Sequence, residues 1–117
     1  MRLATLARWI DDTLDIGAFG ADSSLNGLQV EGRKTVKRVA TAVDACEETI
    51  RRAARARVDL IVVHHGLFWG PAVPIVGFMA RRLRRLLANG ISLYAAHLPL
   101  DCHPGIGNNA LIADLLG

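Results

Sequence analysis

The sequence predicts an α/β fold: a small, mainly parallel sheet with helices packed on it. Segments with helical periodicity alternate along the chain with short apolar runs, an order typical of parallel strands joined by crossover helices. The length of 117 residues suits one domain with one hydrophobic core. We therefore expect a single α/β domain over residues 1–117.

Helices are predicted where apolar side chains recur on one side at helical spacing. The second of them opens with Glu47 and Glu48 and carries arginines late, as the helix dipole favours. The third is followed by Asn89-Gly90, a typical C-terminal stop. The expected helices are 2–14, 47–57, 77–88 and 107–116.

Strands are predicted over 36–43, 60–63 and 91–96, and a turn with a short extended piece over 21–32. The run 60–63 is wholly apolar, which is typical of a strand covered on both faces. Asp44, the pair His64-His65 and the segment 97–101 each directly follow a predicted strand. Because ligands gather at the carboxyl ends of strands in open parallel sheets, we expect these side chains at one sheet edge.

The adjacent pair His64-His65 is the first candidate metal site. Neighbours on a regular strand point to opposite faces, so two histidines converge only where the strand breaks up, and Gly66 supplies that break. The imidazoles could then reach two metal ions or two sides of one. The alternative is one buried histidine beside an exposed one; following a wholly apolar strand, the pair favours ligands.

The segment after the third strand holds two more histidines and a carboxylate. Asp101 can bind a metal ion or bridge two, and His97 can be a ligand, a partner of a ligand or a proton carrier. Pro99 and Pro104 exclude a regular helix here, so we expect a loop. His103, directly before Pro104, is the histidine we expect to be structural.

Other residues carry weaker signals. Asp44 is either an N-cap of the following helix or a group that supports substrate or ligands. Asn26-Gly27 is ordinarily a turn signal, and the arginines of 81–85 indicate the solvated face of a helix. Phe68 and Trp69 could wall a pocket, or could equally make a core or subunit contact.

Composition excludes several classes of protein. Cys46 and Cys102 are too few for a disulfide framework, so we expect buried or half-buried thiols, although Cys102 flanks the candidate cluster. No apolar run approaches the roughly 20 residues of a bilayer span, so no membrane partner is expected. The start of the chain carries Asp11 and Asp12, unlike a signal peptide. We expect a cytoplasmic protein.

The net charge of +3 is a weak argument for nucleic acid, because nearly all of it comes from arginine in an alanine-rich chain. Nucleic acid is therefore not the expected partner. The sequence has no Gly-rich phosphate loop, nucleophile elbow or CxxC pair. A metal ion with nitrogen and oxygen ligands is the one chemistry that the residues indicate.

Four sequence blocks occur in the order and spacing of a known family. They are Asn26-Gly27-Leu28-Gln29-Val30, His64-His65-Gly66-Leu67-Phe68-Trp69, His97-Leu98-Pro99-Leu100-Asp101 and Gly107-Asn108-Asn109-Ala110. In these blocks the chain resembles the YbgI-like (NIF-three-like) family, whose members are commonly labelled GTP cyclohydrolase I type 2 homologues. The resemblance runs from the first predicted helix to the last residue.

The resemblance implies a dinuclear centre of two divalent metal ions (Zn, Mn, Fe, Ni or Co) in an α/β protein that assembles as a toroidal hexamer of dimers. His64, His65 and Asp101 match N-terminal ligand positions, and His97 matches a histidine beside the metals. Family members are roughly twice as long, and a C-terminal His-x-x-x-Glu motif completes their site. The resemblance therefore predicts that residues 1–117 are a metal-binding domain truncated before the C-terminal half of the family fold.

The function expected from the resemblance is that of a dinuclear metal-dependent hydrolase. Its metals would activate a water to attack a C–N or phosphoester-type bond of a small-molecule nucleotide or cyclic amide, with His97 as the catalytic proton carrier. The alternative is a non-enzymatic metal-binding scaffold or regulatory interaction protein whose ring is its function. A third, weaker hypothesis has the arginines of 51–57 and 81–85 bind nucleic acid.

Overall fold

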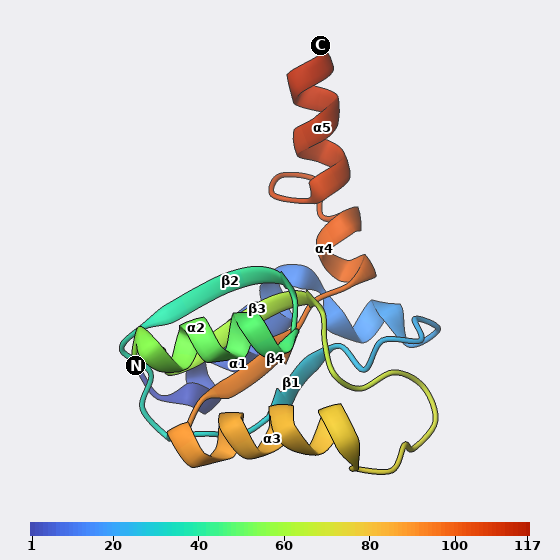
Figure 1. The fold of residues 1–117 in the computed structure, drawn as a ribbon. Helices are drawn as coiled ribbons and strands as arrows, with labels where there is room; N and C mark the ends of the chain where they lie inside the picture. Colours follow the sequence, from blue (N-terminus) through green and yellow to red (C-terminus); the bar gives the residue numbers. More distant parts are fainter.

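A computed structural model describes all residues, 1–117, as one sheet with helices on both faces (Figure 1). The elements in chain order are α1 (Leu3–Leu14), the 3-10 helix η1 (Ile16–Phe19), β1 (Gly27–Val30), β2 (Val39–Asp44), α2 (Glu47–Arg55), β3 (Leu60–His65), α3 (Gly77–Asn89), β4 (Ser92–Ala95), α4 (Leu98–Cys102) and α5 (Asn108–Leu116). The strand order is β1-β4-β3-β2; β2, β3 and β4 are parallel, and β1 runs antiparallel to β4. The predicted α/β fold with a mainly parallel sheet is confirmed.

Two hydrophobic clusters hold the layers together, one on each face of the sheet. Because successive side chains of a strand point to opposite faces, Ile61 and Val63 of β3 join one cluster and Leu60 joins the other. The first cluster lies under α2 and α3, and the second lies under α1. The sheet is therefore covered on both faces, as the wholly apolar run of β3 predicts.

The first long strand begins later than predicted, at Val39 in place of residue 36. The reason is the carboxylate of Asp59, which accepts hydrogen bonds from the backbone N–H groups of Lys37 at 2.9 Å and Arg38 at 3.0 Å. Because these two N–H groups donate to a side chain, they do not pair with a neighbouring strand, and β2 begins after them.

The histidine pair belongs to β3, so the prediction that this strand stops before His64 is wrong. Its pairing with β4 ends at Val63, opposite Ala95, whereas its pairing with β2 continues to His65, opposite Asp44. The histidines thus lie where the strand has lost one neighbour and keeps the other.

The segment after β4 is also not the predicted loop, because residues 98–102 form the short helix α4. Pro99 lies in its first turn, where a backbone N–H has no partner within the helix and proline is tolerated. The final helix, α5, extends away from the sheet (Figure 1), and its bounds agree with the predicted 107–116 to within one residue.

The other predicted helices are found, with differences at their ends. The helix expected over 47–57 ends at Arg55, because Arg57 adopts a left-handed backbone conformation with φ 55°. The stop predicted at Asn89-Gly90 is present: Gly90 caps α3 with φ 63°. No helix of the chain has the length and apolar character needed to cross a membrane.

Candidate metal centre

Three histidines converge at the carboxyl end of the parallel strands. His64 and His65 end β3, and His97 follows β4. Their ring centroids are separated by 4.6 Å for His64–His65, 4.9 Å for His64–His97 and 5.7 Å for His65–His97. One ligand atom from each ring lies within 4.8 Å of the other two, so the three side chains could hold a metal ion.

A carboxylate contacts each of the three imidazoles. Asp101 Oδ1 lies 3.0 Å from Nε2 of His64. Asp44 Oδ1 lies 2.7 Å from Nδ1 of His65, and Asp22 Oδ1 lies 3.0 Å from Nδ1 of His97. A carboxylate that contacts one ring nitrogen orients the ring and fixes which nitrogen is free, as partners of metal-binding histidines do.

The Asp101 carboxylate lies beside His64. Burial raises the pKa of its carboxyl group, but hydrogen bonds from Asn108 and His64 and the nearby His97 outweigh burial and lower the pKa below its ordinary value. Asn108 Nδ2 donates to Asp101 Oδ1 at 2.8 Å. Asp101 is therefore held as a carboxylate, the form that binds metal ions.

Asp22 is the main residue of this site that sequence reasoning missed. Its carboxylate accepts hydrogen bonds from the backbone N–H of Ser24 at 3.0 Å and from Asn26 Nδ2 at 2.9 Å. Although burial raises its pKa, the hydrogen bonds from Asn26, His97 and two backbone N–H groups bring the pKa well below its ordinary value. The only local signal was the Asp-x-Ser-x-Asn spacing, which is typical of a side-chain-stabilised turn.

The turn predicted at Asn26-Gly27 is wrong, because Gly27 is the first residue of β1. Asn26 instead supports the site with its side chain. Its Oδ1 accepts a hydrogen bond from the backbone N–H of His97 at 2.7 Å. It therefore fixes the chain at the point where β4 delivers His97 to the site.

Asp44 is not an N-cap, and the capping interpretation is wrong. The cap of α2 is Cys46, whose Sγ accepts from the backbone N–H of Thr49 at 3.4 Å. Hydrogen bonds from Thr49 lower the pKa of the Cys46 thiol. Asp44 is thereby left free to contact His65.

Trp69 lies against the histidines, although it does not line the pocket that adjoins them. Its ring centroid is 5.0 Å from that of His97 and 6.0 Å from that of His65, and Nε1 donates to the carbonyl of Gly66 at 3.0 Å. Phe68 instead packs against the core cluster under α2 and α3. The two aromatic residues that the sequence left undecided therefore have different roles.

The remaining candidates lie outside the cluster. His103 Nδ1 accepts hydrogen bonds from the backbone N–H groups of Gly105 at 3.0 Å and Ile106 at 3.1 Å, which is a structural role in a turn. Cys102 is exposed and Cys46 half-buried, so the expectation of buried or half-buried thiols fails for Cys102. The arginines of 81–85 alternate between exposed and half-buried positions.

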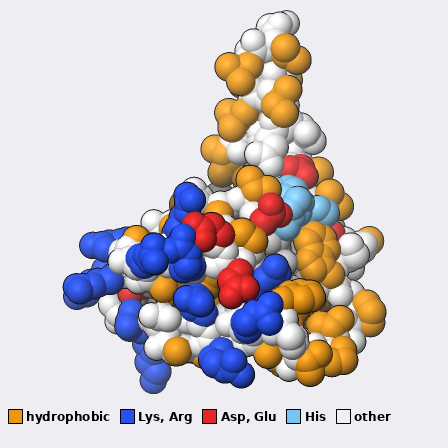
Figure 2. Space-filling model, viewed as in Figure 1, with side chains coloured by type: hydrophobic (Ala, Val, Ile, Leu, Met, Phe, Trp, Pro, Cys, Tyr) orange, Lys and Arg blue, Asp and Glu red, His pale blue; other side chains and the backbone are white.

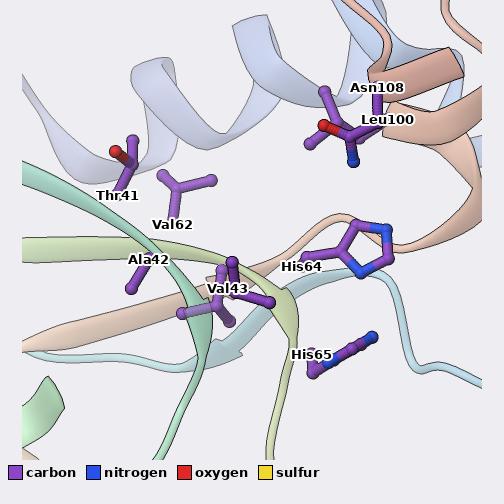
Figure 3. Close-up of a pocket in the computed structure, with 9 residues that line it drawn as sticks. Thr41, Ala42, Val43, Val62, His64, His65, Leu100 and Asn108 are labelled. Carbon is purple, nitrogen blue, oxygen red and sulfur yellow. The ribbon is translucent and has the colours of Figure 1, made fainter. Parts of the chain in front are cut away.

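The histidine cluster is accessible, and acidic side chains surround it. A pocket of about 560 Å³ adjoins it, with His64 and His65 side by side at one end, near Leu100 and Asn108 (Figure 3). Figure 2 shows the histidines beside acidic side chains, whereas most Lys and Arg side chains lie on another part of the visible face. Acidic surroundings favour a cation at the cluster.

The residues present fit a divalent metal ion. Imidazole nitrogen and carboxylate oxygen are common ligands of Zn, Mn, Fe, Ni and Co, and three imidazoles with Asp101 offer enough of them for one ion. Asp22 and Asn26 are not counted among these ligands, because their side-chain oxygen and nitrogen atoms already form hydrogen bonds with each other and with His97.

The fold and the site together define a small α/β protein with a histidine cluster supported by carboxylates at the sheet edge. A family model matches residues 1–117, that of Duf34/NIF3 (NGG1p interacting factor 3), and the chain belongs to this family. This confirms the resemblance seen in the four sequence blocks.

The chain spans about half the length of the curated relatives that it matches. It is 51% identical over 117 residues to a GTP cyclohydrolase 1 type 2 homolog of Archaeoglobus fulgidus, and the match covers 100% of this chain and 47% of the relative. The homolog of the same name in Escherichia coli K12 is 46% identical over 118 residues, again with 100% and 47% covered.

Solved structures show the same fold. The crystal structure of the protein TTHA1606 from Thermus thermophilus matches with a TM-score of 0.97 and 54% identity, covering 100% of this chain and 48% of that chain. The structure of protein ybgI, described as of unknown function, matches with a TM-score of 0.94 and 46% identity, covering 100% and 47%.

Proposed function

We propose that this chain contributes metal ligands to the active site of a metal-dependent hydrolase. The observation that carries the proposal is the convergence of His64, His65 and His97, with Asp101 3.0 Å from His64, at the carboxyl end of the parallel strands. In open parallel sheets, binding sites lie at the carboxyl ends of the strands, and here two separate strands bring candidate metal ligands to that edge.

His64, His65 and Asp101 would hold the metal, and His97 would carry a proton. A bound divalent ion supplies a water of lowered pKa and polarises the bond under attack. His97 suits its role because its Nδ1 is taken by Asp22, which leaves Nε2 to exchange a proton.

The name of the relatives supports hydrolysis as the reaction. They are named as homologs of a GTP cyclohydrolase, and we extend this to a C–N or phosphoester-type bond in a small-molecule nucleotide or a cyclic amide. Two ions per site, a C-terminal His-x-x-x-Glu that completes their ligands, a toroidal hexamer and a cytoplasmic location belong to the same proposal for the whole protein.

Metal content tests the ligand assignment. The chain is loaded with zinc, desalted and analysed by elemental mass spectrometry, alongside the variants His64→Ala and Asp101→Ala. We expect bound zinc in the wild type and a loss of most of it in both variants, with His103→Ala as a matched histidine control that keeps its zinc. Equal zinc in the wild type and both site variants would sink the assignment.

Activity separates an enzyme from a scaffold. A full-length protein with its metals restored is incubated with GTP, other nucleotides and cyclic amides, and products are identified by mass spectrometry. We expect turnover that chelation abolishes and that His97→Ala lowers. No turnover by a metal-loaded protein would favour the metal-binding scaffold instead, while the zinc measurement would still stand.

A further inference from the structure

The carboxylate of Asp22 is the most constrained group around the histidine cluster. Its side chain is 2% exposed, and both oxygens are engaged. Oδ1 accepts from Ser24 N, and Oδ2 accepts from Asn26 Nδ2 and, at 3.2 Å, from the backbone N–H of Leu98. His97 Nδ1 completes the set, at 3.0 Å from Oδ1 and 3.2 Å from Oδ2.

This arrangement determines which nitrogen of His97 carries the proton. An ionised carboxylate can only accept hydrogen bonds, so Nδ1 of His97 must donate to it. A neutral imidazole has one N–H, and with that hydrogen on Nδ1 the lone pair is on Nε2. The backbone cannot swing the ring away, because Asn26 Oδ1 and Asp22 Oδ2 accept the N–H groups of His97 and Leu98.

The pair formed by His65 and Asp44 has the same atoms but a weaker constraint. Nδ1 of His65 lies 2.7 Å from Asp44 Oδ1, yet the two side chains are 44% and 61% exposed. Water competes for hydrogen bonds at an exposed pair, so Asp44 restrains its histidine less than the buried Asp22 does.

We propose that Asp22 is a positioning residue: it fixes neutral His97 in the tautomer that carries hydrogen on Nδ1 and thereby presents the Nε2 lone pair to the site. This inference rests on the proposed function, in which Nε2 accepts a proton. It assigns to Asp22, with Asn26 as its support, a role in the site without contact to the reacting atoms.

The tautomer can be measured on the metal-free chain. Long-range ¹H–¹⁵N correlation spectra of ¹⁵N-histidine-labelled protein, recorded with a chelator at a pH where imidazole is neutral, report which ring nitrogen carries hydrogen. We expect the Nδ1–H form for His97 in the wild type. In Asp22→Asn, whose amide can donate to Nδ1, we expect the Nε2–H form to appear.

Asp44→Asn is the matched control, which should change the spectrum of His65 and leave that of His97 as in the wild type. Finding the Nε2–H form of His97 in the wild type, or the same tautomer in wild type and Asp22→Asn, would overturn the proposal. The wild-type spectrum alone shows which tautomer His97 adopts, so the proposal can be tested even if Asp22→Asn fails to fold.

Zinc titration connects the tautomer to the site. The proposed ligands are His64, His65 and Asp101, and Asp22 contacts none of them, so we expect Asp22→Asn to bind zinc with an affinity within a few-fold of the wild type while its His97 tautomer changes. A loss of roughly 10-fold or more, the size typical for a group that orients a ligating histidine, would show that His97 is itself a ligand and would overturn its pairing with Asp22 as a proton carrier. A wild-type chain that shows the expected tautomer but binds no metal would instead contradict the proposed function and leave the positioning role intact.

Discussion

The side-chain amide of Gln29 holds the loop that follows the histidine pair: its Oε1 accepts a hydrogen bond from the backbone N–H of Leu67 at 2.8 Å. The same oxygen accepts from Phe68 N at 3.2 Å, and Nε2 donates to the carbonyls of Leu25 and Phe68. One side chain of β1 thus ties together two of the sequence blocks that carry the family resemblance.

Replacing Gln29 by Leu should destabilise the chain and loosen this loop. The change leaves two backbone N–H groups without their partner, at a cost of about 1–3 kcal/mol in the free energy of unfolding. Urea denaturation measures it, with Asn109→Leu, which also removes an amide but from an exposed position of α5, as control. Equal losses in both variants would contradict the role of Gln29.

Gly66 is required by packing, so Gly66→Ala should be destabilising. A Cβ atom there would lie 2.7 Å from Cβ of Ala95 and would clash with the amide of Gln29. Overpacking of this kind costs about 1–3 kcal/mol. Gly20→Ala is the control, because a Cβ at Gly20 meets nothing within 4 Å; the prediction fails if thermal denaturation shows equal midpoints for the two variants.

Asp59 should make stability depend on acid pH. Hydrogen bonds from the backbone N–H of Lys37, and then of Arg38 and the Arg33 guanidinium, outweigh burial and lower its pKa in the folded state. Its contribution is therefore complete above the unfolded pKa of about 4 and is lost as pH falls through the lower folded pKa.

Asp59→Asn should accordingly lose about 1–3 kcal/mol at pH 7, and the difference from the wild type should shrink toward pH 2. Denaturant unfolding at a series of pH values measures this. Asp12→Asn, at an exposed position of α1, is the control and should stay close to the wild type. A difference for Asp59→Asn that is constant from pH 7 to pH 2 would exclude the ionic origin.

Trp69 should report metal binding by fluorescence. Its ring is 5.0 Å from that of His97, and the other tryptophan, Trp9, is exposed on α1. In a Trp9→Phe background we expect Co²⁺ or Ni²⁺ to quench the remaining emission in a saturable way, because these ions accept excitation energy at short range. Quenching of the same size and midpoint in His64→Ala would show that the ion binds elsewhere.

Local pattern was enough to predict the fold class and the strand-end position of His64 and His65. A helix that buries one face has apolar residues at helical spacing, and a strand that buries both faces, such as β3, is wholly apolar. Both patterns can be recognised from residues that are neighbours in the sequence. The same logic misjudged Pro99, because proline is excluded from a helix interior and tolerated in the first turn.

The roles of Asp22 and Gln29, which support the site and its loop, could not be predicted from the local sequence pattern. Asp22 contacts a histidine 75 positions along the chain, and Gln29 contacts a backbone N–H 38 positions along. Such contacts depend on β1 lying antiparallel beside β4 in the sheet, a pairing that no periodicity of either segment specifies. An Asp and a Gln in polar turns and short strands look locally like solvated residues.

By itself, the sequence therefore determined the α/β order of elements and which strand delivers the histidine pair, because those depend on neighbours in the chain. The sequence also predicted that the segment beginning at His97 meets this pair at one sheet edge, but the tertiary structure decided which carboxylate contacts which ring: Asp22 contacts His97, Asp101 contacts His64, and Asp44 contacts His65 instead of capping a helix. These are relations between side chains brought together by the sheet order, and only the packed sheet sets their distances.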